Sequence, residues 1–222
     1  MWRKIDADDI YTALVGYVNK ISSSSEKSYR ILISFIDKLV ELNKIRALSL
    51  NHSMMELAVA RYLVESGFEN VDIEIKLDAD LVADVVGYKG ARTVVEIETG
   101  FVPAEYSHEP LQYLKARLTS KIARYSALAD VFILAFPTYY LPPIPKILLK
   151  KPKERAPTIL KELKSLVDKY YRNPPIDYEL IERSLVQKLF VLNVDSGRVI
   201  ELSPEDLIEI YEAVGKLYMD PY

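Results

Sequence analysis

The chain contains no cysteine. This absence excludes disulfide bonds, thiol catalysis and cysteine-ligated zinc or iron–sulfur sites, and it fits a reducing compartment. Histidine is nearly as scarce: His52 and His108 are the only two, so one chain cannot build a zinc site from several imidazoles. The seven glycines form no phosphate-binding loop, dinucleotide fingerprint or nucleophile elbow. Nucleotide-driven motors, serine hydrolases and Rossmann oxidoreductases are therefore poor candidates.

Long apolar stretches are also missing. No run approaches the roughly 20 apolar residues that a membrane span requires, and the first residues are not followed by the apolar core of a signal peptide. Half of the 222 residues are hydrophobic and 27% are charged, a composition that supports one substantial folded domain, with or without a helical extension. We therefore expect a soluble protein of the cytoplasm, or of the host cytoplasm if the source is a virus.

The formal net charge is −3, which is not the balance of a protein that coats nucleic acid. The charge is uneven, however, because residues 146–172 contain nine basic and three acidic residues. This segment can hold phosphate groups, or it can be an ordinary solvated linker and helix face. Under the first interpretation, Lys150, Lys151 and Lys153 are candidates for binding nucleic acid.

Hydrophobic periodicity predicts an α/β fold with a mixed central sheet, extended by helices at both ends. Three regions follow: a helical layer over 1–50, a core over 51–137, and a basic linker with helices and a hairpin packed on the core over 138–222. The helices are expected over 7–20, 26–46, 51–66, 110–128, 158–172, 177–187 and from about 204 to 218. The strands are expected over 71–77, 81–88, 93–99, 131–136, 189–194 and 198–202. Residues 137–157, which hold six of the twelve prolines, are expected to be a linker or an extended arm.

Acidic residues interrupt three of these apolar segments: Glu56 in a helix, Asp84 in the second strand and Glu96 in the third. A buried carboxylate either shifts its pKa or finds a partner, and a metal ion is the strongest partner. Helical spacing points Glu56 inward, and strand alternation puts Glu98 on the same face as Glu96. The pattern therefore predicts a site for a hard cation such as Mg2+, which prefers oxygen ligands.

Simpler interpretations exist for each of these residues. Asp84 could pair with a buried lysine or cap a turn, and Glu56 could be a partly exposed helix acid. Glu98 could be a surface residue, and Lys121 could be a solvated helix lysine. The two histidines are expected to be caps or surface groups. Tyr139 and Tyr140 could stack on nucleobases or be ordinary core or surface residues. The second interpretation is favoured, because the chain has sixteen tyrosines.

The order helix, three-strand meander, helix, strand, with acids at Glu56, Asp84 and Glu96, resembles the PD-(D/E)XK nuclease superfamily over roughly residues 50–137. That superfamily includes restriction endonucleases, archaeal Holliday-junction resolvases and virus-encoded nucleases of thermophilic archaea. The resemblance implies a restriction-endonuclease-like fold and a Mg2+- or Mn2+-dependent endonuclease that hydrolyses DNA phosphodiester bonds. It also makes an archaeal or viral source and a homodimer plausible.

By this resemblance, Asp84 and Glu96 would be metal ligands. The main-chain carbonyl of Ile97 would complete the ligands on the third strand, and Glu56 would be a third acid. Glu98 stands where the family pattern has lysine, and Ala83 where it has proline. Glu98 could then bind a second metal or position water, and Lys121 could supply the missing cation. Arg117 and Arg124 would contact phosphate. The rival hypothesis is a catalytically inactive nuclease-fold module that binds nucleic acid or a protein partner.

Overall fold

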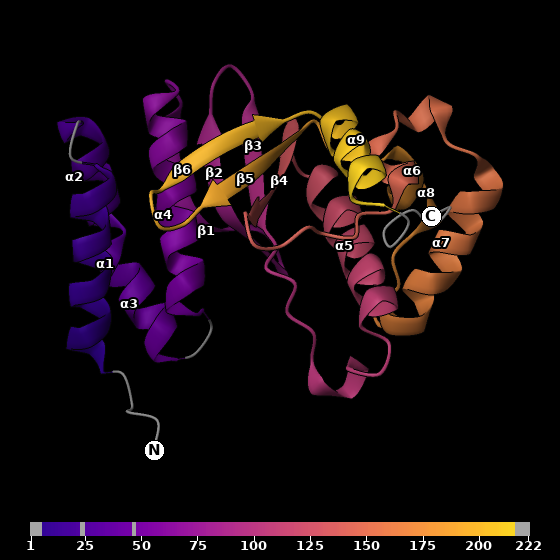
Figure 1. The fold of residues 1–222 in the computed structure, drawn as a ribbon, viewed down its shortest axis with the longest axis horizontal. Helices are drawn as coiled ribbons and strands as arrows, with labels where there is room; N and C mark the ends of the chain where they lie inside the picture. The colour runs from indigo at the N-terminus through magenta and orange to yellow at the C-terminus, as the bar shows by residue number, and fades with distance from the viewer. Residues whose placement is uncertain (1–5, 23–24, 46–47, 216–222) are drawn as a thin grey trace. The chain divides into compact units, whose positions relative to one another are not determined.

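The computed structural model describes residues 6–22, 25–45 and 48–215. It confirms an α/β fold, in which six strands of the described chain form a mixed sheet flanked by helices (Figure 1). The chain divides into two compact units. Unit 1 comprises residues 1–90 and 192–199, and unit 2 comprises residues 91–191 and 200–222.

Unit 1 is built around one central helix. Its elements are α1 (Ala7–Ile21), α2 (Glu26–Ser34), α3 (Ile36–Lys44), α4 (Leu50–Glu65), β1 (Glu69–Asp78) and β2 (Leu81–Tyr88). Asp6 caps α1 as its side chain accepts a hydrogen bond from the Asp9 backbone N–H. Helix α4 contacts both strands on one side and α1 and α2 on the other (Figure 1). Polar side chains in the middle of α4 are therefore enclosed by protein.

The single helix expected over 26–46 is wrong, because α2 and α3 are separated by a turn at Phe35. The Ser34 hydroxyl donates a hydrogen bond to the Ile31 carbonyl, in competition with the regular helical bonding. Phe35 is buried, so the two short helices still share one apolar face. The apolar stripe was visible in the sequence, but the break within it was not.

An irregularity in the β1–β2 pair sets which residues face each other. Asp78 lies opposite Leu81, but Ile75 lies opposite Ala83 and Ile73 opposite Val85, so the register shifts by one residue near the turn. This shifted register places Glu74 across from Asp84 on the same face of the pair. Glu74 has a positive φ of 49°, an uncommon conformation for a residue with a side chain.

Unit 2 is built around two parallel strands. Strands β3 (Arg92–Ile97) and β4 (Val131–Pro137) pair from Thr93 opposite Val131 to Ile97 opposite Ala135. Helix α5 (Pro110–Ser126) contacts both strands, and α7 (Pro157–Tyr170) and α8 (Tyr178–Arg183) pack against α5. The 3-10 helices Ala104–Tyr106 and Pro152–Glu154, α6 (Lys146–Leu149) and α9 (Pro204–Val214) also belong to unit 2. Strands β5 (Lys188–Asn193) and β6 (Arg198–Leu202) contribute residues to both units.

The segment 137–157 differs from an extended arm. It contains α6, and Ile144, Ile147 and Leu148 are buried within unit 2. Arg155 is only 6% exposed and donates hydrogen bonds to five backbone carbonyls, those of Leu148, Lys150, Ile181, Glu182 and Ser184. Its guanidinium thus satisfies backbone acceptors of this segment and of the C-terminal end of α8. The basic segment is fixed in place, and Lys150, Lys151 and Lys153 remain exposed on it.

Two expected helices have different ends. The helix expected over 177–187 stops at Arg183, because Ser184 turns to extended backbone and its hydroxyl donates to the Ile181 carbonyl. The last helix ends at Val214, and the rest of the expected helix, from 216 on, lies outside the described residues. The other helices and strands agree with the expected ranges to within a few residues.

Candidate functional site

Unit 1 contains a compact group of four side chains, which we call the acid–histidine cluster: His52, Glu56, Glu74 and Asp84. Each offers one ligand atom, and these atoms all lie within 4.8 Å of one another. His52 and Glu56 lie one turn apart on α4, and Glu74 and Asp84 lie on β1 and β2. The cluster could hold a metal ion, because the spacing and the three carboxylates suit a single cation.

Several polar atoms of the cluster are buried without a hydrogen bond. Glu56 has no exposed surface, and neither of its carboxylate oxygens has a hydrogen-bond partner within the described chain. His52 Nε2 lies 3.3 Å from Glu56 Oε1 and 3.3 Å from Asp84 Oδ1, without the geometry of a hydrogen bond to either. Buried polar atoms in this state are rare in folded proteins and indicate a missing partner.

The surroundings shift the proton affinities within the cluster. Burial raises the pKa of Glu56 to about 8, against a smaller lowering by His52. Burial also lowers the pKa of His52, but its close contacts with Asp84 and Glu56 outweigh this and raise it to about 10. Burial raises the pKa of Glu74, while its contact with Glu56 and, to a lesser extent, the charges of His52 and Lys38 lower it; Lys38 also donates to the neighbouring Ile73 carbonyl. Without a metal, the cluster retains protons at neutral pH that a cation would displace.

Two members of the cluster were not expected from the sequence. His52 was expected to be a cap or a surface group, yet its side chain is only 17% exposed and faces two acids. No role was predicted for Glu74, which lies within the strand expected over 71–77. The spacing of His52 and Glu56, four residues apart on one helix, was an available signal. The register shift that aligns Glu74 with Asp84 had no signal in the sequence.

In unit 2, Glu96 is paired with a cation from α5. Glu96 is buried on β3, and Lys121 Nζ lies 3.1 Å from its Oε2. The same ammonium donates a hydrogen bond of 2.8 Å to the main-chain carbonyl of Ile97. Lys121 therefore contacts both of the oxygen donors that the family resemblance assigns to the third strand. It is not a solvated surface lysine, since its side chain is only 17% exposed.

Glu98 follows β3 and is fully buried, so the interpretation as a surface residue is wrong. Its Oε1 accepts hydrogen bonds from the backbone N–H groups of Thr99 and Gly100, and Arg117 Nε lies 3.1 Å from its Oε2. Arg117 also donates to the Phe101 carbonyl at 3.1 Å. In this arrangement Glu98 and Arg117 hold the start of the loop that follows β3.

The other basic candidates lie in different surroundings of unit 2. Arg124 of α5 donates to the Pro174 carbonyl at 3.4 Å. Lys150, Lys151 and Lys153 are exposed on the segment that Arg155 anchors. His108 is mostly exposed and lies 3.8 Å from Glu109.

Comparison of the chain with protein-family models, with curated proteins and with solved structures gives no match. Among the helices of the described residues, none is both long enough and apolar enough to cross a membrane.

Proposed function

We propose that the chain is a metal-dependent endonuclease of the PD-(D/E)XK type that hydrolyses DNA phosphodiester bonds. The observation that carries this proposal is the acid–histidine cluster, in which the buried oxygens of Glu56 lack a hydrogen-bond partner among the described residues. A structural role would require these oxygens to be satisfied, whereas a divalent cation would satisfy them directly.

The donor set favours Mg2+ or Mn2+. Three carboxylates and one imidazole offer mainly hard oxygen ligands, and the imidazole makes Mn2+ the better match of the two. When bound, such an ion would activate a water molecule and neutralise charge on the scissile phosphate. Asp84 and Glu56 would hold it, and His52 would lose its proton as the ion binds, since a protonated imidazole has no free lone pair.

The residues of unit 2 fit the same chemistry. Glu96 and the Ile97 carbonyl are the oxygen donors that the resemblance assigns to the third strand, and Lys121 holds a positive charge against both. Glu98 stands in the place of the usual lysine, and the resemblance makes Lys121 the candidate for the missing cation. Glu98 contributes by fixing the following loop together with Arg117.

The test is cleavage of supercoiled, linear, single-stranded and four-way-junction DNA with Mg2+ or Mn2+. We expect metal-dependent cleavage that falls about 100-fold or more in Asp84→Asn and in Glu96→Gln, the loss typical of disturbed metal sites. Asp80→Asn is the matched control, because Asp80 is an exposed acid in the turn beside β2. Cleavage that persists in both site variants, or that is lost equally in the control, would contradict the proposal.

One observation favours a second candidate, a nuclease-fold module that binds nucleic acid without cutting it. Lys121 contacts the two oxygens of Glu96 and Ile97 that would otherwise face a metal, so its ammonium can replace the ion there. This candidate predicts DNA binding without cleavage under any metal condition. It also predicts that Lys121→Met destabilises the fold, because the buried Glu96 loses its cationic partner.

A further inference from the structure

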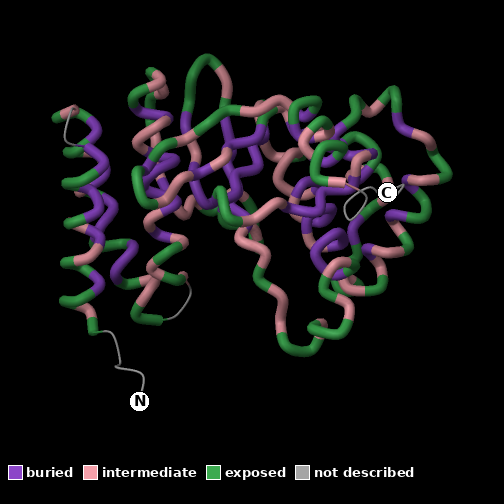
Figure 2. The backbone as a smooth tube through the Cα atoms, in the orientation of Figure 1, coloured by how far each residue is buried: buried purple, intermediate pink, exposed green. Residues whose placement is uncertain are grey.

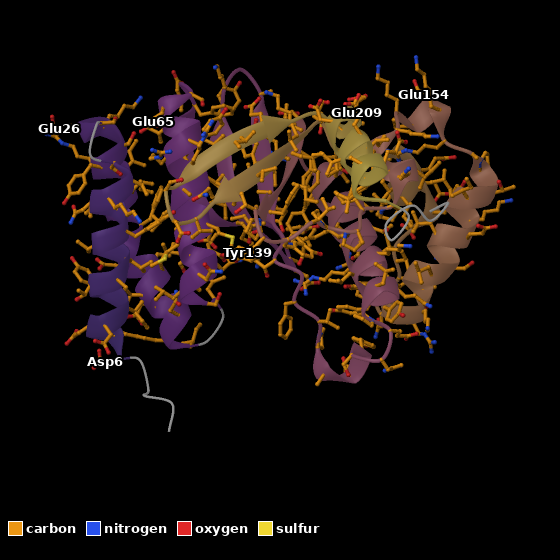
Figure 3. The ribbon with its side chains drawn as sticks, in the orientation of Figure 1. Asp6, Glu26, Glu65, Tyr139, Glu154 and Glu209 are labelled. Atoms are coloured by element: carbon orange, nitrogen blue, oxygen red, sulfur yellow. The ribbon has the colours of Figure 1, made fainter. Side chains whose placement is uncertain are left out.

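Two exposed aromatic residues lie at one edge of the parallel strand pair in unit 2. Strands β3 and β4 run in the same direction, so the loops that follow Ile97 and Pro137 leave from the same edge. Phe101 lies in the first loop and Tyr139, labelled in Figure 3, lies in the second. Each is 65% exposed, so most of each aromatic side chain is accessible to solvent.

The two loops touch each other at a glycine. Gly100 has a φ of +77°, and a Cβ atom at this position would lie 2.5 Å from a ring carbon of Tyr140. The ring of Tyr140 therefore lies directly against the Gly100 backbone. Because Phe101 and Tyr139 are the immediate chain neighbours of these two residues, the contact ties their positions together.

The backbone that carries Phe101 is held in place although its side chain is exposed. Glu98 accepts hydrogen bonds from Thr99 and Gly100, and Arg117 donates to the Phe101 carbonyl. Figure 2 shows the rest of this loop, up to α5, as exposed or half-exposed. A rigid base beneath an exposed ring lowers the entropy lost when a ligand stacks on that ring.

The edge also has the position expected for a ligand. Ligands of α/β sheets bind beyond the carboxyl ends of parallel strands. Glu96, Ile97 and Lys121 lie at this end of β3, where Lys121 is paired with Glu96, and Arg117 of α5 is paired with Glu98. Exposed aromatic rings bind single-stranded nucleic acid by stacking, because each base offers a flat face.

We propose that Phe101 and Tyr139 form a stacking platform for unpaired nucleobases, so that the substrate contains a single-stranded segment, such as a flap or a free strand. This inference rests on the proposed function, since it names the substrate class of that activity. Fully paired duplex hides its base faces and gains nothing from the platform.

The test measures equilibrium binding of fluorescein-labelled single-stranded and duplex 20-mers in EDTA, where no metal-dependent cleavage occurs. Phe101→Ala and Tyr139→Ala are each expected to weaken single-strand binding about 5- to 100-fold, the loss typical of one stacked base, and to change duplex binding less than about twofold. Phe101→Tyr and Tyr139→Phe keep a ring and are expected to bind as the unchanged protein does. Phe101→Leu keeps apolar character without a ring and is expected to behave like Phe101→Ala.

Tyr88→Ala is the matched control, because Tyr88 is an exposed aromatic residue of unit 1. Three outcomes would each overturn the inference. They are equal weakening of single-strand and duplex binding, unchanged binding in both alanine variants, and no binding of either oligonucleotide by the unchanged protein. Cleavage assays on the same proteins separate the two proposals. Selective loss of single-strand binding without any metal-dependent cleavage would support the platform and reject the nuclease, whereas cleavage with unchanged binding in the variants would reject the platform alone.

Discussion

The burial of Glu56 affects both its protonation and its capacity to bind a metal ion. Its carboxyl group has no exposed surface, and its oxygens have no hydrogen-bond partner in the described part of the chain. With a pKa near 8 it carries a proton at pH 7, so the metal-free protein avoids burying a full charge there. The same group becomes an anionic ligand as soon as a cation displaces the proton.

Glu56→Gln should separate these two roles. At pH 7 and in EDTA, we expect the free energy of unfolding to change by less than about 1 kcal/mol, because a neutral amide replaces a neutral carboxyl of similar shape. The rise in melting temperature on adding Mn2+ should disappear, because the ligand is lost. Glu65→Gln, in the last turn of the same helix (Glu65 is labelled in Figure 3), should keep the full rise. Thermal melts with and without Mn2+ measure both effects, and a full Mn2+ response in Glu56→Gln would count against the cluster as a metal site.

The pH dependence of stability follows from the raised pKa values of Glu56 and His52. Both are higher in the folded protein than their ordinary values of 4.5 and 6.5, so both stabilise the fold at low pH and lose this contribution as pH rises through about 8 and about 10. In EDTA, the free energy of unfolding should therefore fall between pH 5 and pH 9.

Metal binding should show the opposite pH dependence, because the ion displaces protons. The apparent affinity for Mn2+ is expected to rise with pH by up to about tenfold per unit below pH 8. Denaturant unfolding at several pH values, each with EDTA or Mn2+, measures both trends. Stability in EDTA that is flat or rises across this range would show that the cluster is not protonated as described.

At the scale of elements, the loops are where backbone conformation and packing are most closely coupled. Gly90 and Gly100 both have positive φ values, of 72° and 77°, but a Cβ atom at Gly90 would meet nothing within 4 Å. Gly90→Ala should thus cost about 1–2 kcal/mol, the cost of the left-handed conformation alone. Gly100→Ala should cost at least about 1 kcal/mol more, because the ring of Tyr140 must move. Urea unfolding of the two variants compares them, and equal losses would mean that the ring moves away freely.

The elements themselves were largely predictable, because they depend on local patterns. Short sequence patterns are enough to indicate the apolar face of α1, the caps at Asp6 and Ser203, and the proline that begins α5. The elements that were predicted wrongly depend on hydrogen bonds from side chains to the backbone. Ser34 ends α2 early, and Arg155 converts an expected linker into packed structure. Neither hydrogen-bonding arrangement produces a periodic pattern in the sequence, so neither could be predicted from periodicity.

The candidate site was predictable in its acids but not in its partners. Glu56, Asp84 and Glu96 were singled out because a carboxylate within an apolar run needs a reason, and all three are buried. Glu74 was missed because its alignment with Asp84 depends on a register shift beside the turn. Lys121 and Arg117 lie one turn apart on α5 and pair with Glu96 and Glu98 respectively. The family resemblance named Lys121 as a candidate cation, but neither pairing was predicted.

At the scale of the whole molecule, a chain with a net charge of −3 can still bind DNA if its positive charge is concentrated. Lys150, Lys151 and Lys153 are exposed on a segment that the hydrogen bonds of Arg155 hold in one conformation. Replacing all three with glutamine should reduce the slope of log Kd against log salt concentration by about one for each lysine that contacts a phosphate. Binding should weaken similarly for all DNA sequences.

A matched variant separates local charge from net charge in this prediction. Replacing Lys20, Lys27 and Lys76, three exposed lysines of unit 1, with glutamine gives the same net charge. We expect this variant to keep the salt dependence of the unchanged protein. Titrations of duplex DNA at several salt concentrations measure the slopes, and equal slopes for the two triple variants would remove the basic segment from the DNA interface.

The positive φ of Glu74 has a consequence for how this sequence can drift. Glycine would adopt this backbone conformation without cost, and one nucleotide change converts a glutamate codon into a glycine codon. At position 74 the backbone conformation therefore opposes the carboxylate, whereas Asp84 has no such backbone cost. In descendants that no longer need the acid–histidine cluster, glycine or asparagine should replace Glu74 before Asp84 changes. A substitution at position 74 would then be the first sign in the sequence that the cluster is no longer used.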